Sequence, residues 1–189
     1  MQEIKRRSQK ERSDTMRAAL VAAGRDLFIR NGFAATGTPD IVAAAGVTRG
    51  ALYHHFQDKT DLFAAVVEAE AEAIAAEIDA SGSIGLTPRE TLIQGGEAFL
   101  AAMRSPGRAR LMLVEAPAVL GVDRLARIDA ATGGRTLELA LQEVGIEAPG
   151  PLAALLSAAY DRAALAIDLG QPPGPWRAAL NHLVRGAIR

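Results

Sequence analysis

The sequence predicts an all-α fold of about nine helices. Alanine and leucine dominate, and aromatic residues make up only 4% of the chain. Apolar residues recur at spacings of three and four, and we find no segment with a convincing period-2 alternation. Such a composition favours helices packed closely on helices. The 49% of apolar residues and 23% of charged residues are ordinary values for a globular protein that buries a core.

We expect three parts along the chain: residues 1–13, 14–60 and 61–189. The first is polar and basic with no apolar stretch, so it is not a secretory signal, and we expect a disordered arm. Its charges are Lys5, Arg6, Arg7, Lys10 and Arg12. Two roles are open for this arm: a solubilising tail, or an arm that touches DNA.

Three short helices follow the arm. Residues 14–31 carry apolar residues at helical spacing, and Asn31-Gly32 is typical of a left-handed helix end. The next helix covers 38–45, with Pro39 in its first turn, where the missing N–H is not needed. Gly46 makes a turn, and Thr48 is a natural N-cap for a helix over 48–54.

Longer helices follow. Residues 59–80 place Leu62, Val66, Ala69, Ala73 and Ala76 on one stripe. The glutamates of this helix, at 68, 70, 72 and 77, are expected to face water. Residues 87–104 begin with Thr-Pro-Arg-Glu, which combines an N-cap, a proline at the first position and a glutamate at the third.

The C-terminal part alternates helices with glycine and proline breaks. We expect helices over 108–116, 118–144, 152–169 and 176–188. Pro117 separates the first two, and 132–134 is a weak point in the second. Residues 170–175 read as a rigid linker.

Charge and cysteine content exclude several classes of protein. The first 60 residues hold ten Lys/Arg and six Asp/Glu (+4), and the rest hold eleven and sixteen (−5), which gives the net charge of −1. A basic end suits a protein that meets phosphate with that end. The chain has no cysteine, which rules out disulfides and thiolate metal sites and fits a reducing cytoplasm. We predict no metal, no cofactor and no membrane span.

The helix over 48–54 presents a polar arc. With Leu52 facing the core and about 100° per residue, Arg49, Tyr53, Gly50 and His54 lie at about 60°, 100°, 160° and 200°. These positions face away from the core, while Leu52 and Phe56 anchor the helix. A short helix, a glycine turn and a second helix with such an arc are typical of a helix-turn-helix that reads DNA.

Residues 15–66 resemble the DNA-binding domain of the TetR family of transcriptional regulators. The likeness rests on more than 50 contiguous residues in order. It runs through Ala22-Ala23, Leu27-Phe28, Gly32-Phe33, Thr36, Asp40-Ile41, residues 45–50 (Ala-Gly-Val-Thr-Arg-Gly), residues 52–56 (Leu-Tyr-His-His-Phe), Lys59 and Leu62.

The resemblance implies a set of residues that contact DNA. They are Thr36, Thr38, Thr48, Arg49, Gly50, Tyr53, His54 and Lys59. The threonines and Lys59 would meet phosphates, and the others would lie in or against the major groove. Two roles are open for Arg49: bidentate hydrogen bonds to guanine, or hydrogen bonds to a backbone phosphate. Tyr53 could instead fill a groove between helices, and His55 is expected in the core or as a cap.

This chain departs from the family pattern before the second helix. Gly37 stands where the family commonly has Ser or Thr, and Thr38-Pro39 follows. The helix cap can shift by one residue here, so it is open whether Thr36 or Thr38 meets the phosphate.

The resemblance also implies that 61–189 bind a small molecule and form a homodimer. Candidate ligand-binding residues are Phe99, Met103, Met112, Glu115, Leu137 and Tyr160. Candidate dimer residues are Leu152, Leu155, Leu156, Ala159, Ala163, Leu180, Leu183 and Val184. Both sets could instead be core, and Glu115 could pair with Arg110 or Arg135.

We therefore expect a ligand-responsive transcriptional repressor that acts as a homodimer on a palindromic double-stranded operator, and not an enzyme. The effector is unknown. Glu115, Tyr160 and Asp161 are the only catalytic candidates, and they form no recognisable constellation. A third interpretation is an interaction protein with a vestigial DNA-binding head.

Overall fold

The computed structural model describes residues 2–82 and 84–188 and is helical, with no strand in that part of the chain. It divides into two compact units, residues 1–68 and 69–189, called here the head and the body. The division falls inside α4 (Lys59–Ala80), after residue 68, whereas the sequence predicted it near the start of the same helix, at 60/61. Each unit is described by itself.

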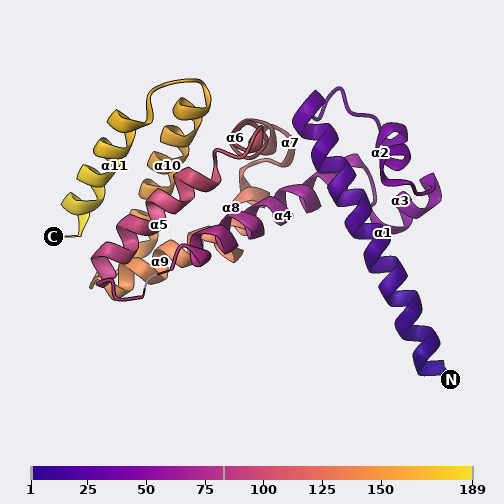
Figure 1. Ribbon diagram of the computed structural model, residues 1–189, viewed down its shortest axis with the longest axis horizontal. Helices are drawn as coiled ribbons and strands as arrows, with labels where there is room; N and C mark the ends of the chain where they lie inside the picture. The colour runs from indigo at the N-terminus through magenta and orange to yellow at the C-terminus, as the bar shows by residue number, and fades with distance from the viewer. Residues whose placement is uncertain (1, 83, 189) are drawn as a thin grey trace. The chain divides into compact units, whose positions relative to one another are not determined.

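The head consists of α1, α2, α3 and the first part of α4 (Figure 1). Their bounds are α1 (Gln2–Asn31), α2 (Thr38–Ala45), α3 (Arg49–His55) and the first part of α4 (Lys59–Ala80). Helix α1 begins at Gln2, so residues 2–13, for which the sequence predicts a disordered arm, are helical in the structure. Gln, Glu, Lys and Arg fill this stretch without Gly or Pro, and all four are good helix formers.

An aromatic cluster forms the core of the head. The Phe63 ring lies edge-on to Phe28 and Phe33, with centroids 5.0 Å apart in both pairs. Helices α1 and α4 pack closely at Gly24, where an added Cβ would lie in ordinary van der Waals contact with Leu62 and Val66. All residues from Leu62 to Val67 are buried, which explains why the start of α4 belongs to the head.

In its described residues, the body contains the rest of α4 and eight further elements. In order they are α5 (Pro88–Ala102), α6 (Arg108–Arg110), the π-helical segment η1 (Leu111–Glu115), α7 (Ala116–Leu120), α8 (Val122–Ala131), α9 (Gly133–Glu143), α10 (Pro149–Asp168) and α11 (Pro173–Ala187). At the start of α5, the Thr87 hydroxyl accepts from Glu90 N and the Glu90 carboxylate accepts from Thr87 N, as the sequence predicted. Most of the predicted helices are present, with shifted ends.

The predicted helix over 118–144 is wrong, because the structure divides it. Gly121 has φ +74°, which ends α7, and Thr132 leaves helical geometry between α8 and α9. The Thr132 hydroxyl donates to Ile128 O at 2.9 Å and so closes α8. Before Pro117 the chain widens into a π-turn, in which Ala116 N donates to Leu111 O. A proline ring cannot fit against the carbonyl four residues earlier in a regular helix.

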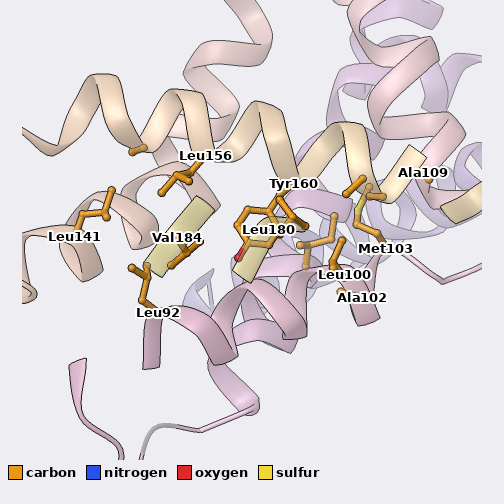
Figure 2. Close-up of a cluster of buried hydrophobic side chains, with 14 of the residues drawn as sticks. Leu92, Leu100, Ala102, Met103, Ala109, Leu141, Leu156, Tyr160, Leu180 and Val184 are labelled. Atoms are coloured by element: carbon orange, nitrogen blue, oxygen red, sulfur yellow. The ribbon is translucent and has the colours of Figure 1, made fainter. Parts of the chain in front are cut away.

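The body core joins α5, α9, α10 and α11 (Figure 2). Tyr160 of α10 lies near the middle of the labelled side chains, and its ring is edge-on to Phe99 at 6.0 Å. A Cβ at Gly96 would overlap the Tyr160 phenol, so only glycine lets α10 approach α5 there. Burial and the nearby Glu97 carboxylate raise the pKa of Tyr160 to about 12.

Within the described residues, no helix combines the length and apolar character needed to cross a membrane.

Candidate nucleic-acid interface

The turn between α2 and α3 is fixed by glycine and threonine. Gly46 has φ +64°, and its N–H donates to Ala43 O, while Val47 N donates to Val42 O at 3.1 Å. This is the backbone pattern that ends helices at a left-handed glycine. The Thr48 hydroxyl then accepts from Ala51 N at 3.2 Å and caps α3, as predicted.

Helix α3 buries one side and exposes the other as its sequence predicts. Leu52 is fully buried, with Ile41 of α2 also in the core, and Phe56 follows the end of α3 into the interior. Arg49, Gly50 and His54 are exposed, and Tyr53 is 45% exposed. Contact with DNA requires that these four residues are exposed on one helix, and they are. The contact itself stays a prediction.

Two side chains of this surface lie against one another. The Arg49 guanidinium carbon lies 5.5 Å from the centroid of the Tyr53 ring, one helical turn away. Hydrogen bonding from the Thr38 side chain, and then from Arg49, lowers the pKa of the Tyr53 phenol below its ordinary value of 10.0. The sequence did not predict the contact between Arg49 and Tyr53.

Thr36 and Thr38, the two candidates for one phosphate contact, have different environments in the structure. Thr36 is 1% exposed, and its hydroxyl donates to Gly32 O at 2.7 Å. The Thr36 hydroxyl therefore has its hydrogen-bond acceptor inside the head. Thr38 is partly exposed at the first position of α2, whose N-cap, Gly37, provides no side-chain hydrogen bond. Thr38 is the threonine that can face a phosphate.

Lys59 has structural partners that the sequence did not reveal. Its Nζ donates to Phe33 O at 2.8 Å and Thr36 O at 3.0 Å, and lies 4.2 Å from the centre of the Phe33 ring. The ammonium thus ties the start of α4 to the loop between α1 and α2. Only one of its three N–H donors is left for a phosphate, and that contact stays a prediction.

His55 is half-buried, as expected for a residue on the inner side of α3. Its Nε2 is buried and has no hydrogen-bond partner in the described part of the chain. Burial, the neighbouring His54 and Arg17 lower the pKa of His55 below 6.5. Arg17 of α1 also lies over the Phe56 ring at 5.3 Å, a contact absent from the sequence prediction.

The basic residues of the predicted arm are on α1. Lys10 and Arg12 are exposed. The side chains of Lys5, Arg6 and Arg7 lie outside the described part of the structure.

The residues predicted to line a ligand cavity form packed core. Met103 and Tyr160 are buried in the body cluster, and Phe99, Met112 and Leu137 pack against it. The Tyr160 ring reaches across to α5 and fills the space between helices. Glu115 instead pairs with Arg110, whose Nη2 donates at 2.6 Å, which is the ion pair considered from the sequence.

The body also carries an open surface groove of about 530 Å³. It lies along α5 between the loop after α4 and the end of α11. Its lining is Ser81, Leu86, Glu90, Ile93, Gln94, Glu97, Ala98 and Arg185. None of these residues was predicted as ligand-binding.

The candidate dimer residues divide into two groups. Leu156, Ala163, Leu180 and Val184 are buried in the body core. Leu152 and Ala159 are partly buried. Leu155 of α10 and Leu183 of α11 are 70% and 52% exposed. Four of the eight candidates are thus internal packing, because apolar spacing on a helix does not tell which neighbour covers it.

Comparisons with known proteins agree with this geometry. The family model described as "Bacterial regulatory proteins, tetR family" matches residues 20–66. The chain is 44% identical over 63 residues to the transcriptional regulator AcrR of Shigella flexneri, a match that covers 33% of this chain and 29% of the relative. It is 40% identical over 62 residues to the transcriptional repressor BepR of Brucella suis, again covering 33% and 29%. The chain thus spans less than a third of the length of these curated relatives.

Solved structures extend the likeness to the body. A TetR-family transcriptional regulator from Pectobacterium atrosepticum is 29% identical, with 95% of each chain covered and a TM-score of 0.70. A TetR-family regulator from Rhodococcus, at 20% identity, shares the fold with a TM-score of 0.76 over 93% of this chain. Residues 20–66 thus match the model of the tetR family of bacterial regulatory proteins, and the whole chain is similar in fold to TetR-family transcriptional regulators.

Proposed function

We propose that this protein is a sequence-specific DNA-binding transcriptional regulator, a ligand-responsive repressor that acts as a homodimer on a palindromic operator. The observation that carries the proposal is the exposed surface of α3. There Arg49, Gly50, Tyr53 and His54 project from a short helix that is anchored by the buried Leu52. A helix presented in this way fits a DNA major groove.

The chemistry of this surface divides between phosphates and bases. Thr38 and Thr48 stand at the N-terminal ends of α2 and α3, where free backbone N–H groups and hydroxyls bind phosphate oxygens. Gly50 has open space beside it, with only the Thr48 hydroxyl near a Cβ position, so the backbone can approach a base pair closely. Arg49 supplies a fork that matches the O6 and N7 atoms of guanine.

A palindromic operator requires a two-fold dimer. Two recognition helices must lie about 34 Å apart to enter successive major grooves. Leu155 and Leu183 support an interface on α10 and α11, because both are large, apolar and exposed. Ala154, Ala158 and Ala179 are exposed on the same helices and would allow close approach of a second copy.

Ligand response and repression rest on the family resemblance. The regulator LfrR of Mycobacterium smegmatis, 21% identical, has been solved in complex with proflavine. Curated relatives include a repressor, BepR, and an activator, FasR of Mycolicibacterium smegmatis. An effector that entered the body between α5 and α10 would have to displace Phe99 or Tyr160 from the core.

The DNA proposal is tested by selection from random double-stranded DNA, followed by fluorescence anisotropy. Wild-type protein is expected to enrich a palindrome and bind it with a steep salt dependence. Arg49→Ala with Tyr53→Ala should abolish that preference, while Arg104→Ala, an exposed arginine of the body, should keep it. Enrichment of no sequence by the wild type would overturn the proposal.

The dimer is tested by sedimentation equilibrium. We expect a wild-type dimer and a Leu155→Glu monomer, since a buried carboxylate in an apolar interface is costly. Leu139→Glu, at a leucine of α9 that is 48% exposed, is the matched control and should stay dimeric. A wild-type monomer, or a dimeric Leu155→Glu, would contradict this interface.

A further inference from the structure

We propose that Tyr53 is a positioning residue for Arg49, and that the face of its aromatic ring, rather than its hydroxyl, supports the base selectivity of that arginine. This inference rests on the proposed function and deepens it. It assigns to the Tyr53 ring a role in specificity that is separate from any contact of its hydroxyl with DNA.

The two side chains meet along one face of α3. Arg49 is the first residue of α3 and Tyr53 is the fifth, and side chains four residues apart on a helix are neighbours. The guanidinium carbon of Arg49 lies 5.5 Å from the centre of the Tyr53 ring, within the range in which an aromatic face attracts a cation. The guanidinium therefore lies toward the middle of α3, away from the end that Thr48 caps.

Arg49 and Tyr53 differ in stiffness. An arginine side chain has many rotamers, and fixing it at a binding surface costs conformational entropy. A tyrosine side chain has only two torsions, so its ring is a stiffer platform. Within residues 2–82 and 84–188 no carboxylate pairs with Arg49, so the contact with Tyr53 is what restricts the guanidinium before DNA arrives.

The face of α3 that carries this pair has room for a base pair. Tyr53 is 45% exposed, and Arg49 and Gly50 are exposed as well. Apart from its chain neighbours, an added Cβ at Gly50 would meet only the Thr48 hydroxyl, at 3.8 Å. The ring can thus hold Arg49 without filling the space that a base edge needs, which is the condition for a preorganised contact to guanine.

The first test needs no DNA. In the NMR spectrum of the free protein, the ring current of Tyr53 should shift the side-chain proton resonances of Arg49 upfield, and nuclear Overhauser effects should connect the two side chains. Tyr53→Phe keeps the ring and should keep both signals, whereas Tyr53→Leu should remove them. A wild-type spectrum with neither signal would overturn the inference, whatever the DNA measurements show.

The second test measures base preference at every operator position. The probe is the palindrome enriched by the wild type, together with each single-base substitution. Arg49→Ala identifies the position that Arg49 reads, where we expect a loss of discrimination of about 5- to 150-fold. Tyr53→Leu should lower the preference at that same position by about 2- to 5-fold. Tyr53→Phe should restore this preference, whatever its hydroxyl contributes to overall affinity.

A double variant shows whether Tyr53 acts through Arg49. Arg49→Ala with Tyr53→Leu should lose no more preference at that position than Arg49→Ala alone, since both changes remove one contact. Additive losses would give Tyr53 a base contact of its own and would overturn the inference. Circular dichroism melts should confirm that all variants fold, as expected for substitutions at exposed positions.

Two further outcomes count against the inference. If Tyr53→Phe loses as much base preference as Tyr53→Leu, the hydroxyl and not the ring is responsible. If Arg49→Ala weakens binding equally on all sequences and reduces the salt slope by about one, Arg49 is a phosphate ligand with no selectivity for Tyr53 to support. A wild type that enriches no sequence overturns the proposed function and the selectivity argued from it, while the NMR signals still report the contact itself.

Discussion

The head and the body stabilise α4 in different ways. In the head, α4 buries an unbroken apolar run from Leu62 to Val67, and its polar anchor, Lys59, is a partly exposed side chain bonded to backbone carbonyls. In the body, α4 carries Glu70, whose side chain is only 6% exposed and pairs with the equally buried Arg108 at 2.8 Å. The head relies on aromatic packing, and the body relies on a buried charge.

The buried Arg108 of the body connects several groups. Arg108 also donates to Glu77 at 3.0 Å and to Ala102 O at 2.7 Å. Isolated buried charges are far more costly than lost surface contacts. The comparison therefore predicts that polar substitutions in the body destabilise the protein more than those in the head.

The largest effect is expected for Arg108→Met. It leaves the Glu70 carboxylate buried without its arginine and should lower the free energy of unfolding by about 3–5 kcal/mol. Urea unfolding followed by the fluorescence of Trp176, which belongs to α11, measures this in the body. Arg177→Met breaks a pair with Glu97 whose arginine side chain is 54% exposed, and as the control should cost about 0–1 kcal/mol. Equal losses in the two variants would remove the distinction drawn here.

A smaller effect is expected for Lys59→Met in the head. The substitution keeps an apolar stem against Phe33 but removes two hydrogen bonds to carbonyls, at a cost of about 1–2 kcal/mol. Urea unfolding followed by circular dichroism measures it. The salt slope of operator binding separates the two roles of Lys59: an unchanged slope fits a structural anchor, whereas a decrease of about one adds a phosphate contact.

The two units also differ in their response to acid, and Asp161 of the body gives the clearer effect. Burial and the Asp129 carboxylate raise the pKa of Asp161 from 3.8 to about 6. The native state therefore binds this proton more tightly than the unfolded chain, so the free energy of unfolding falls as the pH rises from about 4 to about 6. Between pH 4.5 and pH 7, the free energy of unfolding measured with urea should fall by about 1 kcal/mol through Asp161, and Asp161→Asn should remove that decline. Asp168→Asn, at an exposed site of α10, should leave that decline in place.

His55 of the head should act in the opposite direction, with the smallest effect. Because its pKa lies below 6.5 in the native state, the unfolded chain binds the proton more tightly, and stability falls as the pH drops through about 6.5. An NMR titration of the imidazole protons measures the pKa directly. A His55 pKa at or above 6.5 would show that the packing of α3 imposes no penalty on the charged ring.

The sequence predicted the head better than the body. The bounds of α2, its end at Gly46 and the Thr48 cap of α3 depend on local chemistry within four residues, and all are as predicted. The break at Thr132 falls in the predicted weak point at 132–134, but the break at Gly121 was not predicted, because a glycine inside an apolar pattern does not reveal whether it ends a helix. Glu70 was expected to face water, since its partner lies 38 residues away along the chain.

The sequence by itself determined the helix-turn-helix and which residues of α3 face outward, because helical periodicity and capping act over a few residues. The tertiary structure decided which polar groups are free. It buried Thr36, bonded Lys59 to two carbonyls, and placed Tyr160 against Gly96 in the core. Each of these depends on a contact between distant residues or separate helices, and no local pattern encodes which side chain will meet another after the chain has packed.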